Sequence, residues 1–191
     1  MNLEQRLLVG SLPLRQLAEV GWNWMTGRPD LPARPYTLPL YVTYRCNLKC
    51  VHCSLWDRPD GEYEMDLPTL KKVVLDLKQW LKLPAITLIG GEPFLRPDTI
   101  DLLRFCREQG VLVLVVTNGA MLSDRLAREL VELGVYKVAV SVDGRNDETH
   151  DATRGVEHAR ASTERGLRRL KRWRSELGAR TGIAVYTILN E

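Results

Sequence analysis

Three cysteines lie within eight residues, at a spacing that could hold a metal cluster. Cys46, Cys50 and Cys53 form the pattern C-x3-C-x2-C, and thiolates at this spacing on a loop can converge on one face of a cuboidal iron–sulfur cluster. The usual structural [4Fe–4S] cluster takes four cysteine thiolates, so three leave one iron open for a small ligand. By analogy with zinc, an open coordination position marks a catalytic site rather than a structural one.

Two other metal sites could use the same cysteines. A zinc site could combine them with His52 or His150, although zinc motifs usually come as paired C-x2-C elements. An electron-transfer cluster would need Cys106 as a fourth ligand. Cys106 falls on the apolar face of an expected helix, where free cysteine is commonly a small buried residue.

The cysteine loop directly follows the first expected strand, and there it resembles the signature of the radical S-adenosylmethionine (SAM) superfamily. The resemblance implies a [4Fe–4S] cluster and SAM as cofactors, with the amino and carboxylate groups of SAM on the open iron. An electron from the cluster would break a carbon–sulfur bond of SAM. The resulting 5′-deoxyadenosyl radical would abstract a hydrogen atom from a substrate. A flavodoxin- or ferredoxin-like electron donor is implied as a partner.

A glycine turn ends the second expected strand. Gly90 and Gly91 let a backbone come close to a ligand, and the Glu92 carboxylate could bind an ammonium group. In the family, the matching GGEP turn holds the amino group of SAM, so these three residues are expected to bind the cofactor. An ordinary glycine turn with a solvated Glu92 is the alternative.

Polar turns also end the third and fourth expected strands. Residues 117–119 resemble the family's TNG turn, which lines the cofactor pocket, so Asn118 is expected in the site. Ser141 and Asp143 form an S-hydrophobic-D-G turn found in many members. Their side chains could bond ribose hydroxyls, and Ser141 could also donate to the SAM carboxylate. Asn and Asp beside Gly favour turns in their own right, so plain turns are the alternative.

Three further side chains lie near these motifs. Arg154 could pair with the SAM carboxylate through its planar guanidinium group, or it could bond to loop backbone. His52 lies where the family often has an aromatic residue beside the adenine, so it could stack on adenine or only pack the loop. His150 is expected to be structural. No residue is singled out as a general acid or base.

Alternating strand and helix signals surround these residues and predict a parallel sheet with right-handed crossovers. Asp66 and Asp98 are expected helix N-caps, and Gly110 and Gly134 are expected helix ends. Apolar segments predict strands over 38–44, 85–89, 111–116, 136–142 and 182–189, and helices are expected over 66–81, 98–110, 123–133 and 157–177.

The expected fold class is therefore α/β, a partial (β/α) TIM-type barrel of parallel strands. The family's core usually has six strands, whereas five are expected here. The barrel would thus be truncated after the fifth strand and would expose a parallel edge. Residues 38–191 are assigned to this incomplete radical SAM core.

Residues 1–37 are expected to form an amphipathic helical segment followed by a proline-rich linker. The helix could pack on the outside of the domain, or it could lie on a membrane surface with Trp22 and Trp24 at the interface. Such a helix would make peripheral membrane contact possible. No stretch approaches the roughly 18 apolar residues of a membrane span.

The composition suits a soluble domain of ordinary size. The chain has 191 residues, of which 45% are apolar, and its net charge of +3 gives no reason to expect nucleic acid. Crowded cysteines without a secretory signal place it in a reducing cytoplasm. The sequence indicates a radical SAM enzyme core that acts on a peptide, a cofactor precursor or a lipid. A non-catalytic iron–sulfur or SAM-binding module and a zinc-binding interaction protein are the alternatives.

Overall fold

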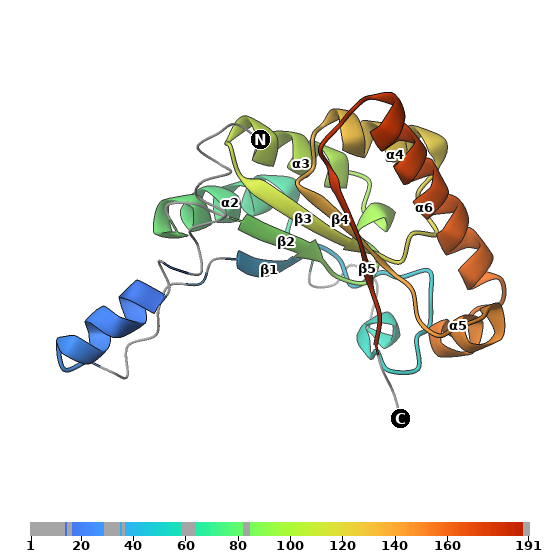
Figure 1. Ribbon diagram of the computed structural model, residues 1–191, viewed down its shortest axis with the longest axis horizontal. Helices are drawn as coiled ribbons and strands as arrows, with labels where there is room; N and C mark the ends of the chain where they lie inside the picture. The colour runs from blue at the N-terminus through green and yellow to red at the C-terminus, as the bar shows by residue number, and fades with distance from the viewer. Residues whose placement is uncertain are drawn as a thin grey trace.

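The computed structural model describes residues 14, 17–28, 35, 37–58, 64–81 and 85–188. Five parallel strands form one sheet in which each strand pairs with its neighbours in the sequence (Figure 1). This arrangement is the one expected of an open part of a (β/α) barrel. The strands are β1 (Thr37–Tyr41), β2 (Ala85–Ile89), β3 (Leu112–Thr117), β4 (Lys137–Ser141) and β5 (Gly182–Tyr186).

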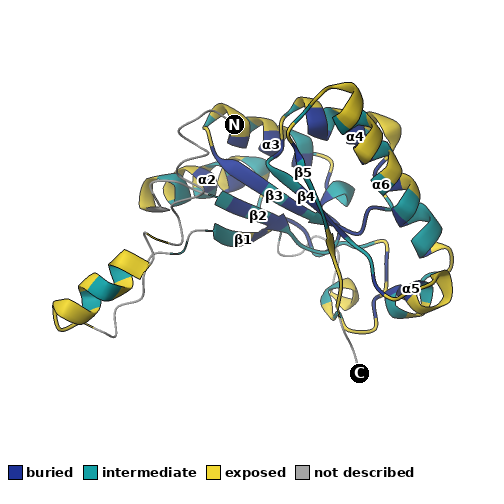
Figure 2. Ribbon diagram, in the orientation of Figure 1, coloured by how far each residue is buried: buried dark blue, intermediate teal, exposed yellow. Residues whose placement is uncertain are grey.

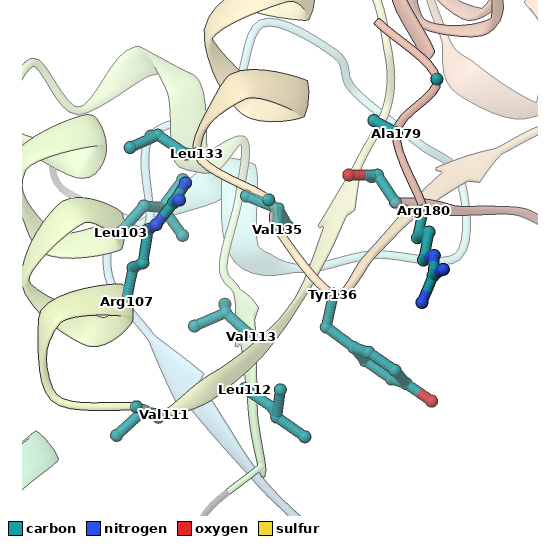
Figure 3. Close-up of a pocket in the computed structure, with 14 residues that line it drawn as sticks. Leu103, Arg107, Val111, Leu112, Val113, Leu133, Val135, Tyr136, Ala179 and Arg180 are labelled. Atoms are coloured by element: carbon teal, nitrogen blue, oxygen red, sulfur yellow. The ribbon is translucent and has the colours of Figure 1, made fainter. Parts of the chain in front are cut away.

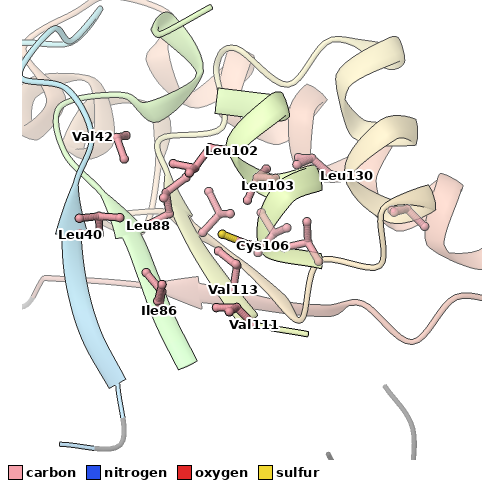
Figure 4. Packing of buried hydrophobic residues seen from close by; sticks show 14 of the residues in the cluster. Leu40, Val42, Ile86, Leu88, Leu102, Leu103, Cys106, Val111, Val113 and Leu130 are labelled. Atoms are coloured by element: carbon pink, nitrogen blue, oxygen red, sulfur yellow. The ribbon is translucent and has the colours of Figure 1, made fainter. Parts of the chain in front are cut away.

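Four helices connect the strands and cover one face of the sheet (Figure 1). They are α2 (Leu67–Leu81), α3 (Thr99–Glu108), α4 (Asp124–Glu132) and α6 (Ala159–Glu176). Alternate strand residues such as Ile86, Leu88 and Val113 point to this face and pack in one cluster with helix residues such as Leu102 and Leu130 (Figure 4). Figure 2 accordingly shows buried residues on the central strands, whereas the edge strands β1 and β5 are mainly intermediate or exposed. The α/β fold class and the parallel sheet predicted from the sequence are confirmed.

The helix boundaries confirm most of the predicted caps. Asp66 Oδ1 accepts a hydrogen bond of 2.9 Å from Thr69 N at the start of α2. Gly110 and Gly134 follow α3 and α4 with positive φ angles. The prediction for Asp98 was wrong in detail, because its carboxylate makes no capping bond. It forms an ion pair with the guanidinium group of Arg96 instead.

Three short helices were missed by the sequence analysis. The longest is α5 (Asp147–Arg154), between β4 and α6, in a segment where no helix was expected. Asn146 caps α5 by accepting from Thr149 N, and Gly155 ends it with a left-handed conformation. The other two are the 3-10 helices η1 (Leu55–Asp57) and η2 (Pro93–Leu95).

Residues 17–25 form a helix, as expected for the N-terminal segment. Its large apolar side chains are exposed, and Trp22 and Trp24 keep 64% and 70% of their surface accessible. Most of the expected proline-rich linker and Leu189 of the fifth expected strand lie outside the described residues. In the part of the chain that the structure describes, no helix is both long and apolar enough to cross a membrane.

A cavity of about 580 Å³ lies where β3, β4 and β5 begin (Figure 3). Its walls combine apolar residues, such as Val111, Val113 and Val135, with polar groups that include Arg107 and Arg180. The guanidinium group of Arg107, at the end of α3, donates to the carbonyl oxygen of Glu132 beside this cavity. None of the predicted site residues lines it, in agreement with the rule that barrel enzymes build their sites at the opposite, carboxyl ends of the strands.

Candidate functional site

The cysteine loop lies beyond the carboxyl end of β1, and each of its three sulfur atoms faces an N–H group. Leu48 N lies 3.5 Å from Cys46 Sγ, and Leu55 N lies 3.4 Å from Cys53 Sγ. The third donor is a side chain, since Nη1 of Arg154 lies 3.6 Å from Cys50 Sγ. Thiolate ligands need such donors to stabilise their charge.

The glycine turn after β2 packs directly against the backbone that leads into the cysteine loop. Gly91 N donates to Thr43 O at 2.9 Å, and Glu92 N donates to Arg45 O at 2.8 Å. A Cβ atom on Gly90 would lie 2.3 Å from Thr43 O, and one on Gly91 would lie 2.2 Å from Arg45 O. Both glycines are therefore required for close backbone packing, in addition to any approach of a ligand.

The Glu92 side chain is fully buried and joins the turns after β2 and β3. Its carboxylate accepts hydrogen bonds from Thr117 Oγ1 at 2.9 and 3.0 Å, from Asn118 N at 2.9 Å and from Phe94 N at 3.3 Å. Burial raises the pKa of Glu92 to about 7, against the lowering effect of these bonds. The carboxyl group is thus poised between its neutral and charged forms.

Asn118 connects the turn after β3 to the cysteine loop. Its Nδ2 atom donates to Asn47 Oδ1 at 2.8 Å, and its Oδ1 atom accepts from Ala120 N at 2.9 Å. Thr163 on α6 donates to the Asn118 carbonyl oxygen at 2.8 Å. The predicted turn is therefore present, and hydrogen bonds with Asn47, Ala120 and Thr163 fix its position.

These elements enclose a cavity of about 350 Å³ at the carboxyl ends of the strands. Nine of the eleven predicted site residues line it. They are Cys46, Cys50, His52, Cys53, Gly90, Gly91, Asn118, Ser141 and Arg154. The structure does not bring the side chains of Glu92 and Asp143 into this lining, because both are buried behind it.

Asp143 and Arg154 form a buried ion pair. Nη2 of Arg154 lies 2.5 Å from Oδ2 of Asp143, and the two side chains are 8% and 2% exposed. The other oxygen, Oδ1, accepts from Ile188 N at 2.9 Å. His150 packs beside the pair, and its Nδ1 lies 3.1 Å from the backbone N of Asp143. Burial lowers the pKa of His150, which fits the structural role expected for it.

Sequence reasoning missed the aromatic and aliphatic lining of the cavity, which is formed by Leu48, Trp56, Ile89, Val116, Tyr186 and Ile188. Trp56 on η1 lines it and donates from Nε1 to Cys50 O at 3.1 Å. Tyr186 and Ile188, at the end of β5, close another side. A tryptophan three residues after the last cysteine of the C-x3-C-x2-C pattern was the available signal for Trp56, whereas β5 carries no motif that marks its end.

The three cysteines fit an iron–sulfur cluster in their placement and chemistry. All three line one cavity, each has an N–H donor, and they interact electrostatically. Burial raises the pKa of Cys46, and the nearby Glu92, Cys50 and Cys53 act in the same direction. Within the described residues, no three His, Cys, Asp or Glu side chains are grouped closely enough to hold a single metal ion. When bound, a cluster would supply one-electron chemistry at this cavity.

Comparison with known proteins agrees with this site. A family model described as the Radical SAM superfamily matches residues 40–182. The chain is 36% identical over 141 residues to the AdoMet-dependent heme synthase of Methanosarcina barkeri, covering 72% of this chain and 40% of that protein. It is 39% identical over 127 residues to the Fe-coproporphyrin III synthase of the same organism, covering 66% and 31%.

A solved structure of anSMEcpe with bound AdoMet has the same fold. It aligns with 79% of this chain and 43% of its own, with a TM-score of 0.63 and 23% sequence identity. This chain spans less than half the length of each of these proteins. The family match includes the cysteine loop and the turns after β2, β3 and β4, and the chain therefore belongs to the radical SAM superfamily.

Proposed function

We propose that this chain forms the core of an enzyme that reductively cleaves SAM to a 5′-deoxyadenosyl radical, which abstracts hydrogen from a substrate. The superfamily uses a [4Fe–4S] cluster and SAM. In the proposal, Cys46, Cys50 and Cys53 bind the cluster. One observation carries it: three sulfur atoms, each with an N–H donor, line a single cavity beside the glycine turn.

Other residues of the cavity are proposed to hold SAM. Gly90 and Gly91 present their backbone at the cavity, and Asn118 after β3 and Ser141 at the end of β4 add polar groups to its lining. His52 is exposed at the rim, where it can stack on the adenine. Glu92 would act from behind the glycines, through its influence on the turn and on the local charge.

The proposed substrate is a tetrapyrrole. The two relatives named above are a heme synthase and an iron-coproporphyrin synthase. The lining of the cavity supports the choice, because Ile89 and Val116, which are half-buried on neighbouring strands, present apolar side chains to it. An apolar wall of this kind can contact a flat apolar ring. A flavodoxin- or ferredoxin-like protein is proposed as the electron donor.

The experiment is anaerobic reconstitution followed by reduction with dithionite in the presence of SAM. Wild type is expected to form 5′-deoxyadenosine. Cys50→Ala is expected to form none, because two thiolates should not retain the cluster. Cys106→Ala is the matched control, since Cys106 is buried in the apolar core with a pKa raised to about 12 by burial, and it should retain both iron and activity.

Three outcomes separate the alternatives. A brown protein with iron and sulfide that never yields 5′-deoxyadenosine is a non-catalytic module. A protein that binds zinc without iron is a zinc-binding protein. For the substrate, iron-coproporphyrin is titrated while its absorption band is followed, and an unchanged band in an active preparation rejects the tetrapyrrole assignment alone.

A further inference from the structure

We propose that Arg154 is a positioning residue of the cluster site, which fixes the Cys50 sulfur and raises the reduction potential of the cluster. The inference rests on the proposed function, because it requires the three cysteines to bind the cluster. It also differs from both roles considered from the sequence, in which Arg154 pairs with the SAM carboxylate or bonds to loop backbone. The contacts of the Arg154 guanidinium group support this inference.

The guanidinium group lies between a sulfur atom and a carboxylate, and both contacts are buried. Nη1 lies 3.6 Å from Cys50 Sγ, and Nη2 lies 2.5 Å from Oδ2 of Asp143. Asp143 is itself fixed, since its Oδ1 accepts from Ile188 N at 2.9 Å. The planar fork of arginine holds its two nitrogen atoms in a fixed relation, so anchoring one of them at Asp143 directs the other at the sulfur.

The backbone around Arg154 fixes the same cysteine from the other direction. Lys49 N donates to Arg154 O, and Val51 N donates to Thr153 O, both at 3.0 Å. The residues on either side of Cys50 are therefore bonded to the last turn of α5. Gly155 follows at φ +68°, and a Cβ atom there would lie 2.2 Å from Lys49 O. Helix α5 thus ends directly against the cysteine loop.

Among the three sulfurs, Cys50 has the charged donor. Cys46 and Cys53 face the backbone amides of Leu48 and Leu55. A charged donor makes a hydrogen bond roughly twice as strong as a neutral one, and hydrogen bonds to sulfur and net charge both set cluster potentials. Reduction adds one negative charge to the cluster. A buried cation on Cys50 stabilises that state, while Asp143 opposes part of its effect.

The test is a redox titration of the reconstituted full chain without SAM, with dithionite as the one-electron reductant and the reduced cluster followed by electron paramagnetic resonance. Arg154→Gln should shift the reduction equilibrium about tenfold toward the oxidised cluster, which is about 59 mV for one electron. Arg154→Lys keeps the charge and should recover part of the shift. Arg128→Gln removes a half-exposed arginine on α4 and should leave the potential unchanged.

Asp143→Asn provides an independent measurement with the opposite sign. It removes the opposing charge but leaves an oxygen to accept from Ile188 N. The reduction equilibrium should therefore shift about threefold toward the reduced cluster, and the potential should become less negative. This prediction holds even where Arg154→Gln fails to assemble a cluster. An Asp143→Asn potential that is unchanged or more negative overturns the inference.

The remaining outcomes separate this inference from the proposed function. If Arg154→Gln keeps the wild-type potential and only weakens SAM binding, Arg154 is a cofactor ligand and the inference is wrong. If wild type itself binds no iron under these conditions, the proposed function fails, and the inference fails with it. If wild type cleaves SAM and none of the potentials moves, only the inference fails.

Discussion

At the scale of single residues, Glu92 combines complete burial with an ionisable carboxyl group. The sequence predicted this residue in the cofactor site from the GGEP turn, and it could not predict that the carboxylate accepts its bonds from the turn after β3. That contact depends on how far β2 and β3 extend in register, with Leu88 opposite Val115. Register of this kind follows from the packing of both strands on the helices.

The raised pKa of Glu92 predicts that the stability of the apo-protein falls as pH rises. Between the ordinary pKa of 4.5 and the native value of about 7, the folded state keeps a proton that the unfolded state has lost. The free energy of unfolding therefore decreases across this interval, by up to about 3 kcal/mol, and is level above it. Urea unfolding at about pH 5 and about pH 8 measures the difference.

Glu92→Gln should remove most of this pH dependence, because the amide does not titrate. The exposed Glu108→Gln on α3 is the control and should keep the wild-type slope. An unchanged slope in Glu92→Gln would show that other groups cause it.

At the scale of elements, the close packing of the glycine turn on the backbone that follows β1 positions the cysteine loop. The sequence predicted all five strands and four connecting helices, because each has its own apolar pattern and end signals such as Ser123 and Gly134. It missed α5, whose buried residues are His150 and Arg154 rather than an apolar stripe. The Asn146 and Gly155 caps were the readable signal, and its buried face is explained only by the cysteine loop that it supports.

Gly91→Ala should prevent the loop from holding a cluster. Its Cβ atom would meet the Arg45 carbonyl oxygen at 2.2 Å, so the turn or the loop must move, at a cost of about 1–3 kcal/mol. Iron content after anaerobic reconstitution measures the loss, with thermal unfolding as the check on folding. Gly21→Ala, where a Cβ atom meets nothing within 4 Å, should bind iron as wild type does. Full iron content in Gly91→Ala would contradict the close packing.

At the scale of the whole molecule, the sheet and its covering helices form an apolar core that does not include the described helix at residues 17–25. The apolar cluster joins β1 to β4 with α2, α3, α4 and α6, whereas the large apolar side chains of the N-terminal helix are exposed. Hydrophobic periodicity predicted that helix but could not tell whether its apolar face has a partner, since the pattern is the same in both cases.

This organisation predicts that the two tryptophans contribute almost nothing to core stability. Trp22→Gln combined with Trp24→Gln should change the free energy of unfolding by less than about 0.5 kcal/mol, as for other exposed positions. Leu88→Ala in the buried sheet should cost about 2–5 kcal/mol in the same urea titration. A large loss in the tryptophan variant would mean that the helix packs on the domain. If the free energy of unfolding is unchanged and the variant cosediments less with anionic vesicles than wild type does, the two tryptophan side chains bind a membrane surface.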